Sequence, residues 1–240
     1  MGTHYLIDHE YRFDNETLFA TMGHLLVYNP GERDSEVAVT VYYEDREPKS
    51  FALATPARQS VETNYTRWPV QPGQRFALKV ESPVPVVCQS TNGWNATAND
   101  YGLKAVTNSP RGVRECALSY MAITALSTDW YTADGLVIDR PTSVYIRESE
   151  WAFILNPGDE PANVTLNFDT AEPRQYPVIV PPRRVTNLYI DDIVQRNKHY
   201  GVHFGSDRPI AAQWRRHVNW NDNPELMAFW SAPCVPGPLT

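Results

Sequence analysis

Few features of this sequence favour helices or membrane spans. It has only four Met against 20 Pro, and no segment keeps the 3.6-residue hydrophobic period of an amphipathic helix. Proline together with many Val, Thr and Tyr residues favours strands joined by turns. No apolar run approaches the ~20 residues needed to cross a bilayer. The first residues, MGTHYLIDHEY, have neither a basic start nor an apolar stretch, so we expect no signal peptide, no membrane insertion and a cytoplasmic location.

Cysteine and positive charge are also scarce. The cysteines Cys88, Cys116 and Cys234 are odd in number and far apart, which argues against a disulfide framework or zinc cluster and predicts buried thiols. The net charge of −7 argues against a nucleic-acid binder, because phosphate neutralisation needs a basic surface. There is no glycine-rich phosphate loop and no nucleophile elbow. We expect no cofactor and no catalytic nucleophile.

What the sequence does contain is an internal repeat. Five short landmarks occur in the same order in both halves, with a slowly drifting offset. The first half has Asn29-Pro30-Gly31, the alternating Val37, Val39 and Val41, then Glu47-Pro48, Pro56-Ala57-Arg58 and residues 85–89. The second half has Asn156-Pro157-Gly158, the alternating Val164, Leu166 and Phe168, then Glu172-Pro173, Pro181-Pro182-Arg183 and residues 209–213. This order predicts a tandem duplication of one structural unit.

The spacing of the alternating segments predicts the fold class. Each half contains short alternating segments about 8–12 residues apart, separated by turn residues, which is typical of β-sandwiches and jelly rolls. We therefore expect an all-β protein made of two tandem β-sandwich or jelly-roll units, residues 1–128 and 129–240. Units of this size can bury their own cores. The polar stretches 90–114 and 217–224 are predicted to be loops at corresponding places in the two units.

The second half resembles the sensory rhodopsin transducer family. The resemblance rests on the strand from Glu150 to Asn156, the turn Pro157-Gly158-Asp159-Glu160, VPPRR at 180–184, and residues 209–213 followed by Arg216. The first half keeps Asn29, Arg58 and Gln89, but Gln59 and Asn92 stand where the second half has Arg184 and Arg216. The resemblance implies a small jelly-roll unit that assembles into a ring-like oligomer, a cytoplasmic protein, and binding of small molecules such as sugars or related metabolites.

Polar and aromatic residues near these landmarks are the candidate ligand-binding residues. Arginine and glutamine offer hydrogen bonds to polar groups, and an aromatic face beside polar side chains suits a sugar ring. On a regular strand Gln213 and Arg216 point to opposite faces, so a joint site would require a bulge. The same residues can instead tie down backbone or pack in the core. The predicted ligand-binding set is Arg183, Gln213, Arg216, Trp214, Trp220, Asn156, Glu150, Arg58, Gln89 and Trp94.

Three functions stay open at this stage. The leading hypothesis is a non-enzymatic, homo-oligomeric protein that binds a small polar ligand, a carbohydrate or sugar derivative. The second is an enzyme on carbohydrates that uses carboxylates such as Glu150 and histidines such as His203. The third is a structural or signalling scaffold. No metal site is predicted, because His199 and His203 on one strand would lie ~13 Å apart, too far to share an ion.

Overall fold

The chain is built almost entirely of antiparallel strands. The computed structural model describes residues 2–11, 13–14, 19–96, 114–140, 146–220 and 223–237. Within these ranges there is one 3₁₀ turn, η1 (Tyr65–Arg67), and no α-helix; accordingly, none of the described segments is a helix that could cross a membrane. The strands are β1 (Gly2–Tyr11), β2 (Phe13–Asp14), β3 (Phe19–Asn29), β4 (Ser35–Tyr43), β5 (Lys49–Thr55), β6 (Gln59–Asn64), β7 (Gln74–Ser82), β8 (Val87–Ala96), β9 (Arg114–Met121), β10 (Ser127–Leu136), β11 (Asp139–Arg140), β12 (Ile146–Asn156), β13 (Ala162–Asp169), β14 (Arg174–Val180), β15 (Arg184–Tyr189), β16 (His199–Trp220), β17 (Asn223–Pro233) and β18 (Val235–Pro236).

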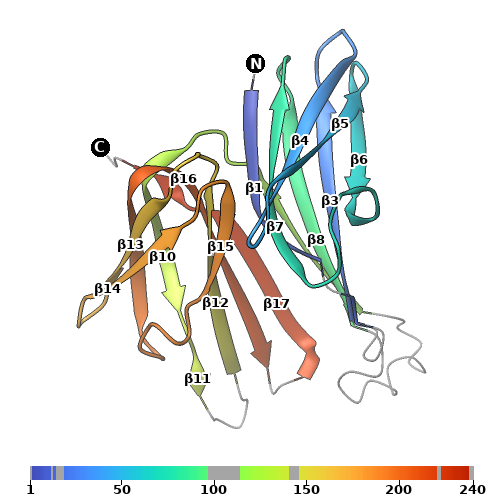
Figure 1. The fold of residues 1–240 in the computed structure, drawn as a ribbon. Coiled ribbons are helices and arrows are strands. Elements are labelled where there is room, and N and C mark those ends of the chain that lie inside the picture. Colours follow the sequence, from blue (N-terminus) through green and yellow to red (C-terminus); the bar gives the residue numbers. More distant parts are fainter. Residues whose placement is uncertain are drawn as a thin grey trace.

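Two β-sandwiches of the same topology make up the chain (Figure 1). In the first unit, sheet A has the order β1-β7-β4-β5, and sheet B joins β2, β6, β3, β8 and β9. In the second unit, sheet C joins β18, β10, β16, β13 and β14, and sheet D joins β11, β15, β12, β16 and β17. The four strands of sheet A correspond to β10, β16, β13 and β14 of sheet C, which has β18 in addition, and sheets B and D correspond strand for strand. The all-β class and the predicted duplication are confirmed. The division after residue 128 stays a prediction, and β10 begins at Ser127.

The units differ in the strand that passes between their two sheets. β16 is one strand of 22 residues. Its first part pairs with β10 and β13 in sheet C, and its second part pairs with β12 and β17 in sheet D. In the first unit the same path is divided into β7 and β8. Pro83 and Pro85 lie in the break; Pro85 has a counterpart in Pro209, which β16 contains, whereas Asp207 stands at the place of Pro83. β16 reaches Trp220 and β17 starts at Asn223, so the loop predicted at 217–224 is wrong and most of it is strand.

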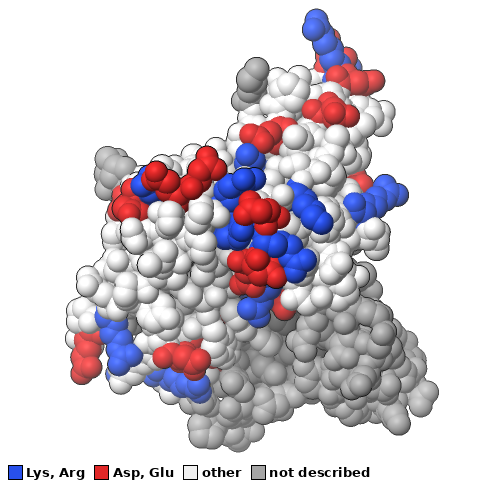
Figure 2. Space-filling view, in the orientation of Figure 1, with Lys and Arg blue, Asp and Glu red and all other residues white. Residues whose placement is uncertain are grey.

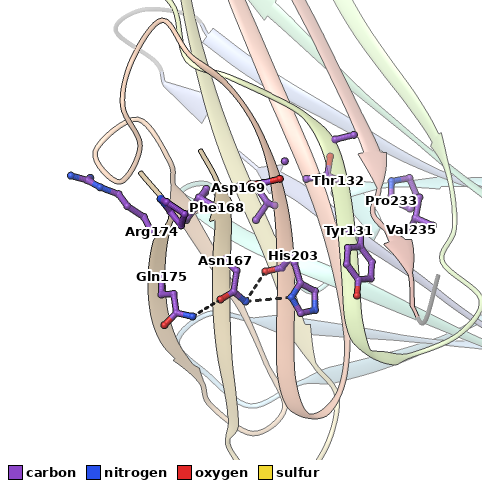
Figure 3. Close-up of a pocket in the computed structure, with 14 residues that line it drawn as sticks. Tyr131, Thr132, Asn167, Phe168, Asp169, Arg174, Gln175, His203, Pro233 and Val235 are labelled. Atoms are coloured by element: carbon purple, nitrogen blue, oxygen red, sulfur yellow. Dashed lines mark hydrogen bonds between the residues drawn. The ribbon is translucent and has the colours of Figure 1, made fainter. Parts of the chain in front are cut away.

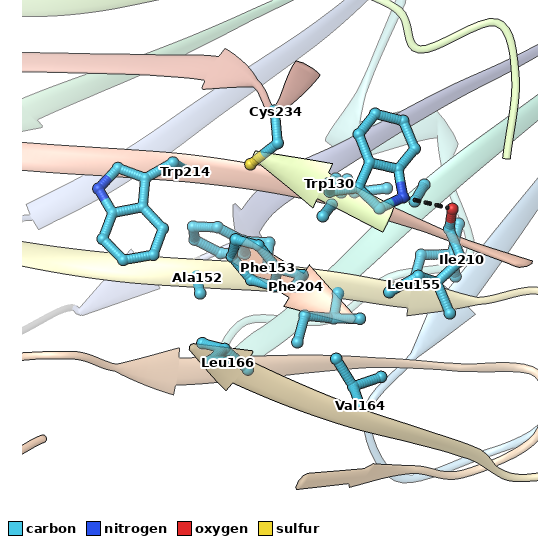
Figure 4. Packing of buried hydrophobic residues seen from close by; sticks show 14 of the residues in the cluster. Trp130, Ala152, Phe153, Leu155, Val164, Leu166, Phe204, Ile210, Trp214 and Cys234 are labelled. Carbon is cyan, nitrogen blue, oxygen red and sulfur yellow. Dashed lines mark hydrogen bonds between the residues drawn. The ribbon is translucent and has the colours of Figure 1, made fainter. Parts of the chain in front are cut away.

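Each unit buries an apolar layer between its two sheets. Alternation along the strands supplies it, for example Val37, Val39 and Val41 in the first unit, all fully buried. In the second unit Trp130 is buried, and its indole Nε1 donates to the carbonyl of Ile210 in the middle of β16 at 3.0 Å (Figure 4). Cys88 and Cys234 are buried free thiols, as predicted. Burial raises the pKa of Cys88 to about 12, so this thiol is unreactive at neutral pH. The side chain of Cys116 lies outside the described residues.

The outer face of sheet A packs against the outer face of sheet D, and this contact joins the units (Figure 1). Tyr5, Ile7, Tyr42 and Ala77 of sheet A belong to the same buried cluster as Phe153 of sheet D. We call this contact the seam. A buried apolar interface of this kind holds two domains in a fixed relation.

A buried ion pair lies within the seam. Arg215 of β16 donates from Nη1 to the Asp8 carboxylate at 3.0 Å, and the two side chains are 7% and 0% exposed. The guanidinium also lies over the rings of Trp151 and Phe153, 5.0 and 4.8 Å from their centroids. Burial raises the pKa of the Asp8 carboxyl, while Arg215 opposes that rise. The pair fixes how the two sheets meet, since an uncompensated charge there would be costly.

Polar contacts border the seam where the β4–β5 turn approaches β15. Arg184 Nη2 donates to Glu47 Oε1 at 2.5 Å, and Asn187 Nδ2 donates to Glu44 Oε1 at 2.8 Å. Figure 2 shows acidic and basic side chains interleaved along this border. Such exposed pairs add little stability individually, but they align the turn with the neighbouring unit.

Replacing Arg215 with Leu should destabilise the protein by about 3–5 kcal/mol at pH 7, because Asp8 then stays buried without its partner. The deficit should be smaller at pH 4, because burial raises the pKa of the Asp8 carboxyl and the variant lacks the guanidinium that opposes this rise, so the carboxyl takes up a proton more readily. Urea denaturation of wild type and variant at both pH values measures it. The double variant Arg215→Leu/Asp8→Asn should recover most of the stability at pH 7. A deficit equal at both pH values would contradict this account of the seam.

His9 should make stability depend on pH. It is fully buried and stacked on Phe76, and burial lowers its pKa from 6.5 to about 3. The unfolded chain therefore takes up a proton below pH 6.5 that the folded chain does not. As the pH is lowered from 6.5 to about 3, this residue should reduce the free energy of unfolding by about 1.4 kcal/mol per pH unit. Urea denaturation at several pH values measures this dependence. The His9→Phe variant should lack this part of the slope of unfolding free energy against pH, whereas His199→Phe, at an exposed position, should keep it.

Candidate functional site

A row of side chains crosses the outer face of sheet C, one from each of its five strands. The strand registers align Val235 with Tyr131, Tyr131 with His203, His203 with Asn167, and Asn167 with Gln175. We call these five residues the sheet C row. In Figure 3 the three polar members lie in line, with the Tyr131 ring beside the imidazole of His203. The row exists because neighbouring residues in register share a face.

Hydrogen bonds connect the polar members of the row. Gln175 Nε2 donates to Asn167 Oδ1 at 2.9 Å, and Asn167 Nδ2 lies 3.4 Å from His203 Nδ1. His203 Nε2 is 2.9 Å from Asp129 Oδ1. That contact lowers the pKa of the Asp129 carboxyl. The Tyr131 and His203 rings are stacked, with centroids 4.7 Å apart and planes at 15°. The network holds the imidazole in one orientation against the sheet.

Two glycines flank His203 on this face, and Gly201 borders a hollow in it. Gly201 and Gly205 lie two residues before and after His203 on β16, on the same face of the strand. A Cβ atom at Gly201 would meet only the Thr132 carbonyl, at 3.6 Å, and one at Gly205 would meet the His203 ring, at 3.4 Å. A pocket of about 810 Å³ opens there, bordered also by Asp169, Arg174 and Pro233. This volume suits a small molecule.

The lining can hold a polar ligand that has one flat face. Tyr131 offers an aromatic surface, and Asn167 and Gln175 offer donors and acceptors. Asp169 and Arg174 supply one charge of each sign at the rim. Among the described residues no three His, Cys, Asp or Glu side chains are grouped so as to hold a metal ion.

Glu150 and Arg216, both predicted to bind ligand, meet inside the second sandwich. Glu150 Oε1 accepts from Arg216 Nε at 2.8 Å and from the Leu136 N–H at 3.0 Å, and Tyr200 donates its hydroxyl to Glu150 Oε2. Burial, followed by the Glu150 charge, raises the pKa of Tyr200. Glu150 is 0% and Arg216 is 5% exposed. The network is therefore enclosed by the protein.

Asp191 extends this network. Its carboxylate accepts from the Ser149 hydroxyl at 2.8 Å, the Tyr189 hydroxyl at 2.7 Å and the Glu150 N–H at 2.9 Å. The segment after β15 is thereby tied to β12, which is what a buried and saturated carboxylate achieves.

Gln213 and Arg216 lie on opposite faces of β16. The register between β12 and β16 runs without a bulge from Leu155–Ala211 to Ile146–Trp220, which confirms the predicted separation. Gln213 Nε2 donates to Ser231 Oγ at 2.7 Å. Trp214 packs inside the sandwich, edge-on to Phe204.

The Asn-Pro-Gly and Arg landmarks form the same turn in both units. Asn156 Oδ1 accepts from the Gly158 N–H at 3.0 Å and its Nδ2 donates to the Glu160 carbonyl at 2.8 Å. Arg183 has a φ of 56° and its N–H donates to the Gly158 carbonyl at 2.9 Å. Arg58 has the corresponding conformation, with a φ of 57°. These landmarks recur because the turn requires them.

The other predicted residues are less informative about a site. Gln89 is partly exposed on the outer face of sheet B. The side chains of Trp94 and Trp220 lie outside the described residues. Ligand roles for the predicted set stay predictions.

The sequence did not predict the sheet C row. A usable signal is present in Gly-Val-His-Phe-Gly at 201–205, since it puts glycine on both sides of a histidine on one strand face.

Changing Glu150 to Gln should destabilise the protein by about 3–5 kcal/mol, because the buried Arg216 then keeps only the more distant carboxylate of Glu148, 3.6 Å from its Nη1. Thermal or urea unfolding measures the change. Asp192→Asn, at an exposed carboxylate next to Asp191, should change stability by no more than about 0.5 kcal/mol. Equal effects of the two substitutions would contradict the assigned role of the network.

Comparison with known proteins agrees with the repeated fold. The family described as Anabaena sensory rhodopsin transducer matches residues 10–107 and 126–231. The solved structure of Thermotoga maritima 1070 is similar, at 20% identity over 46% of this chain and 95% of that chain, with a TM-score of 0.40. The Anabaena sensory rhodopsin transducer is similar at 26% identity over 38% of this chain and 98% of that chain, with a TM-score of 0.32. No curated protein matches the sequence. The chain therefore belongs to the Anabaena sensory rhodopsin transducer family and carries two copies of its domain in tandem.

Proposed function

We propose that this protein binds a small polar ligand of the carbohydrate class in the sheet C pocket and does not transform it. The observation that carries the proposal is the stacked Tyr131–His203 pair beside Asn167 and Gln175, in a pocket of about 810 Å³. A sugar ring presents C–H groups on one face and hydroxyl groups at its edge. An aromatic face with amides beside it matches both surfaces.

The polar members of the row are positioned before a ligand arrives. His203 is held by Asp129 on one side, and Asn167 is held by Gln175 on the other. Fixed side chains lose little conformational entropy on binding, which favours affinity. His203 and Asp129 are about one-third exposed, at 35% and 40%, so both remain within reach of a ligand.

A non-enzymatic role is favoured over the carbohydrate-enzyme alternative. Glu150 is enclosed between the sheets and bonded to Arg216 and Tyr200, whereas His203 lies on an outer face. The two residues predicted for catalysis therefore do not converge on one ligand. General acid–base catalysis requires groups within hydrogen-bond reach of the same substrate.

We further propose that the protein acts in the cytoplasm as a homo-oligomer. Exposed hydrophobic side chains on two outer sheet faces support self-association. The ligand proposal does not depend on it, because every lining residue of the pocket comes from one chain.

Titration calorimetry with monosaccharides, disaccharides, sugar acids and sugar phosphates should give saturable heat for one chemical class. A ligand at 100 times its Kd should add about 2.7 kcal/mol of stability in a thermal-shift assay. Gly201→Leu should abolish binding by filling the pocket, since a Cβ there meets no backbone closer than 3.6 Å. Ser50→Leu, at an exposed position on the edge strand β5 of sheet A, should bind normally. Heat retained by Gly201→Leu, or no heat with the whole panel, would refute the proposal.

A further inference from the structure

The hydrogen bonds along the sheet C row run in one direction and end at Asp129. The contact with His203, followed by that with Thr128, lowers the pKa of the Asp129 carboxyl, so the group is ionised at neutral pH and can only accept hydrogen bonds. Its Oδ2 accepts from the Thr128 hydroxyl at 2.9 Å, and its Oδ1 lies 2.9 Å from His203 Nε2. Nε2 therefore carries a proton.

The Asn167 amide turns its donor end toward the other nitrogen of the same ring. Asn167 Nδ2 lies 3.4 Å from His203 Nδ1, and 3.4 Å from the carbonyl oxygens of both His203 and Thr165. Turning the amide round would place its oxygen against two other oxygens, so Nδ1 must accept and the ring is neutral. Asn167 Oδ1 accepts from Gln175 Nε2 at 2.9 Å. The donors thus point from Gln175 through Asn167 and His203 to Asp129, and Figure 3 shows the first part of this course.

This direction leaves mainly acceptors for a ligand. Asn167 Oδ1 has a second lone pair, because a carbonyl oxygen can accept two hydrogen bonds. Gln175 Oε1 accepts no hydrogen bond from the part of the chain that the structure describes. Both ring nitrogens of His203 are already engaged. A ligand with hydroxyl groups can donate to the two amide oxygens.

The charges around the row have the same preference. Asp169 lies two residues after Asn167 on β13, on the same face of the strand, and it is exposed where it borders the pocket. Arg174 borders the pocket too, but it precedes Gln175 on β14 and so points to the other face. Its Nη1 donates to the Ile193 carbonyl at 2.8 Å, and in Figure 3 its side chain is directed away from the row. Negative charge therefore prevails beside the row.

The first unit lacks this arrangement. Lys79 occupies the place of His203, and Thr3 occupies that of Asp129. Lys79 Nζ pairs with Glu81 Oε2 at 3.0 Å, and an ammonium group only donates. The row of acceptors belongs to the second unit, which predicts one ligand per chain.

We propose that the sheet C pocket selects a neutral sugar over its uronic acid or phosphate ester, and that Asp129 is the positioning residue that sets this preference through His203. This inference rests on the proposed function, since it names the ligand within the carbohydrate class. A neutral sugar brings hydroxyl donors to the amide oxygens of the row. A carboxylate or phosphate group brings only acceptors and a charge of the same sign as Asp129 and Asp169, which costs binding free energy.

Titration calorimetry of the full chain with glucose, galactose and mannose, each beside its own uronic acid and 6-phosphate, tests the selectivity. The neutral sugar that binds should do so about tenfold or more tightly than its uronic acid, because the acid brings a like charge near a carboxylate. Equal or tighter binding of the acid or the phosphate would overturn the inference and leave the proposed function standing. No heat from any of these compounds would refute the proposed function itself.

Asp129→Ala should weaken binding of the neutral sugar about tenfold and narrow its advantage over the uronic acid severalfold. Glu62→Gln is the matched control, because it removes the carboxylate from another exposed pair, His24–Glu62, at 2.5 Å on the first unit. This control should change neither quantity. An unchanged ratio between sugar and acid in Asp129→Ala would overturn the role of Asp129.

Nitrogen-15 NMR of histidine-labelled protein, at a pH above the usual titration range of histidine, tests the same role without a ligand. In the wild type His203 Nδ1 should give the signal of an unprotonated ring nitrogen and Nε2 that of a protonated one. In Asp129→Ala the two signals should move toward each other, because the carboxylate no longer holds the proton on Nε2. The His203→Gln variant assigns the signals. A wild-type proton on Nδ1, or unchanged signals in Asp129→Ala, would contradict the proposed direction of the row.

Discussion

Arg215 and Asp8 form an ion pair nearly shut off from water, on the face where the two units meet. Burying two charges is costly unless they pair closely and their remaining hydrogen-bonding capacity is met. The pair therefore tolerates little relative movement of the sheets, and the rings of Trp151 and Phe153 enclose the guanidinium. With sheet A committed to this contact, only the corresponding face of sheet C stays open. The position of the pocket thus follows from how the units are joined.

The two copies solve the same packing problem with different chemistry. In the second unit, Glu150 faces Arg216 and Tyr200 in the sandwich interior. At the corresponding place on β3 the first unit has Gly23, and the ring of Tyr65 lies so close that a Cβ at Gly23 would overlap it. An aromatic ring occupies the space of a carboxylate, and no charge needs a partner. A duplicated unit can replace a charged network with neutral contacts in this way, here the Tyr65 hydroxyl donating to Asn92 Oδ1 at 3.2 Å, while keeping its fold.

Local patterns were sufficient to predict the fold class but not the pocket. Alternation at Val37, Val39 and Val41 specifies a buried strand face, and the Asn-Pro-Gly landmark specifies a turn, because both depend on neighbours in sequence. The sheet C row depends on pairing between Tyr131, Asn167 and His203. Which residues face one another across a sheet is set by register, which a single sequence does not display. The landmarks were conspicuous because turns demand particular residues, as Arg183 and Asn156 illustrate.

The unbroken course of β16 has a consequence for how the protein opens. A strand shared by two sheets carries both hydrogen-bonded ladders, so losing it exposes the amides of sheets C and D together. In the first unit the break between β7 and β8 separates the ladders of sheets A and B, so either can fray while the other persists. Amide hydrogen exchange in the second unit should therefore be a single cooperative event, whereas the first unit should exchange as two cooperative units with separate opening free energies.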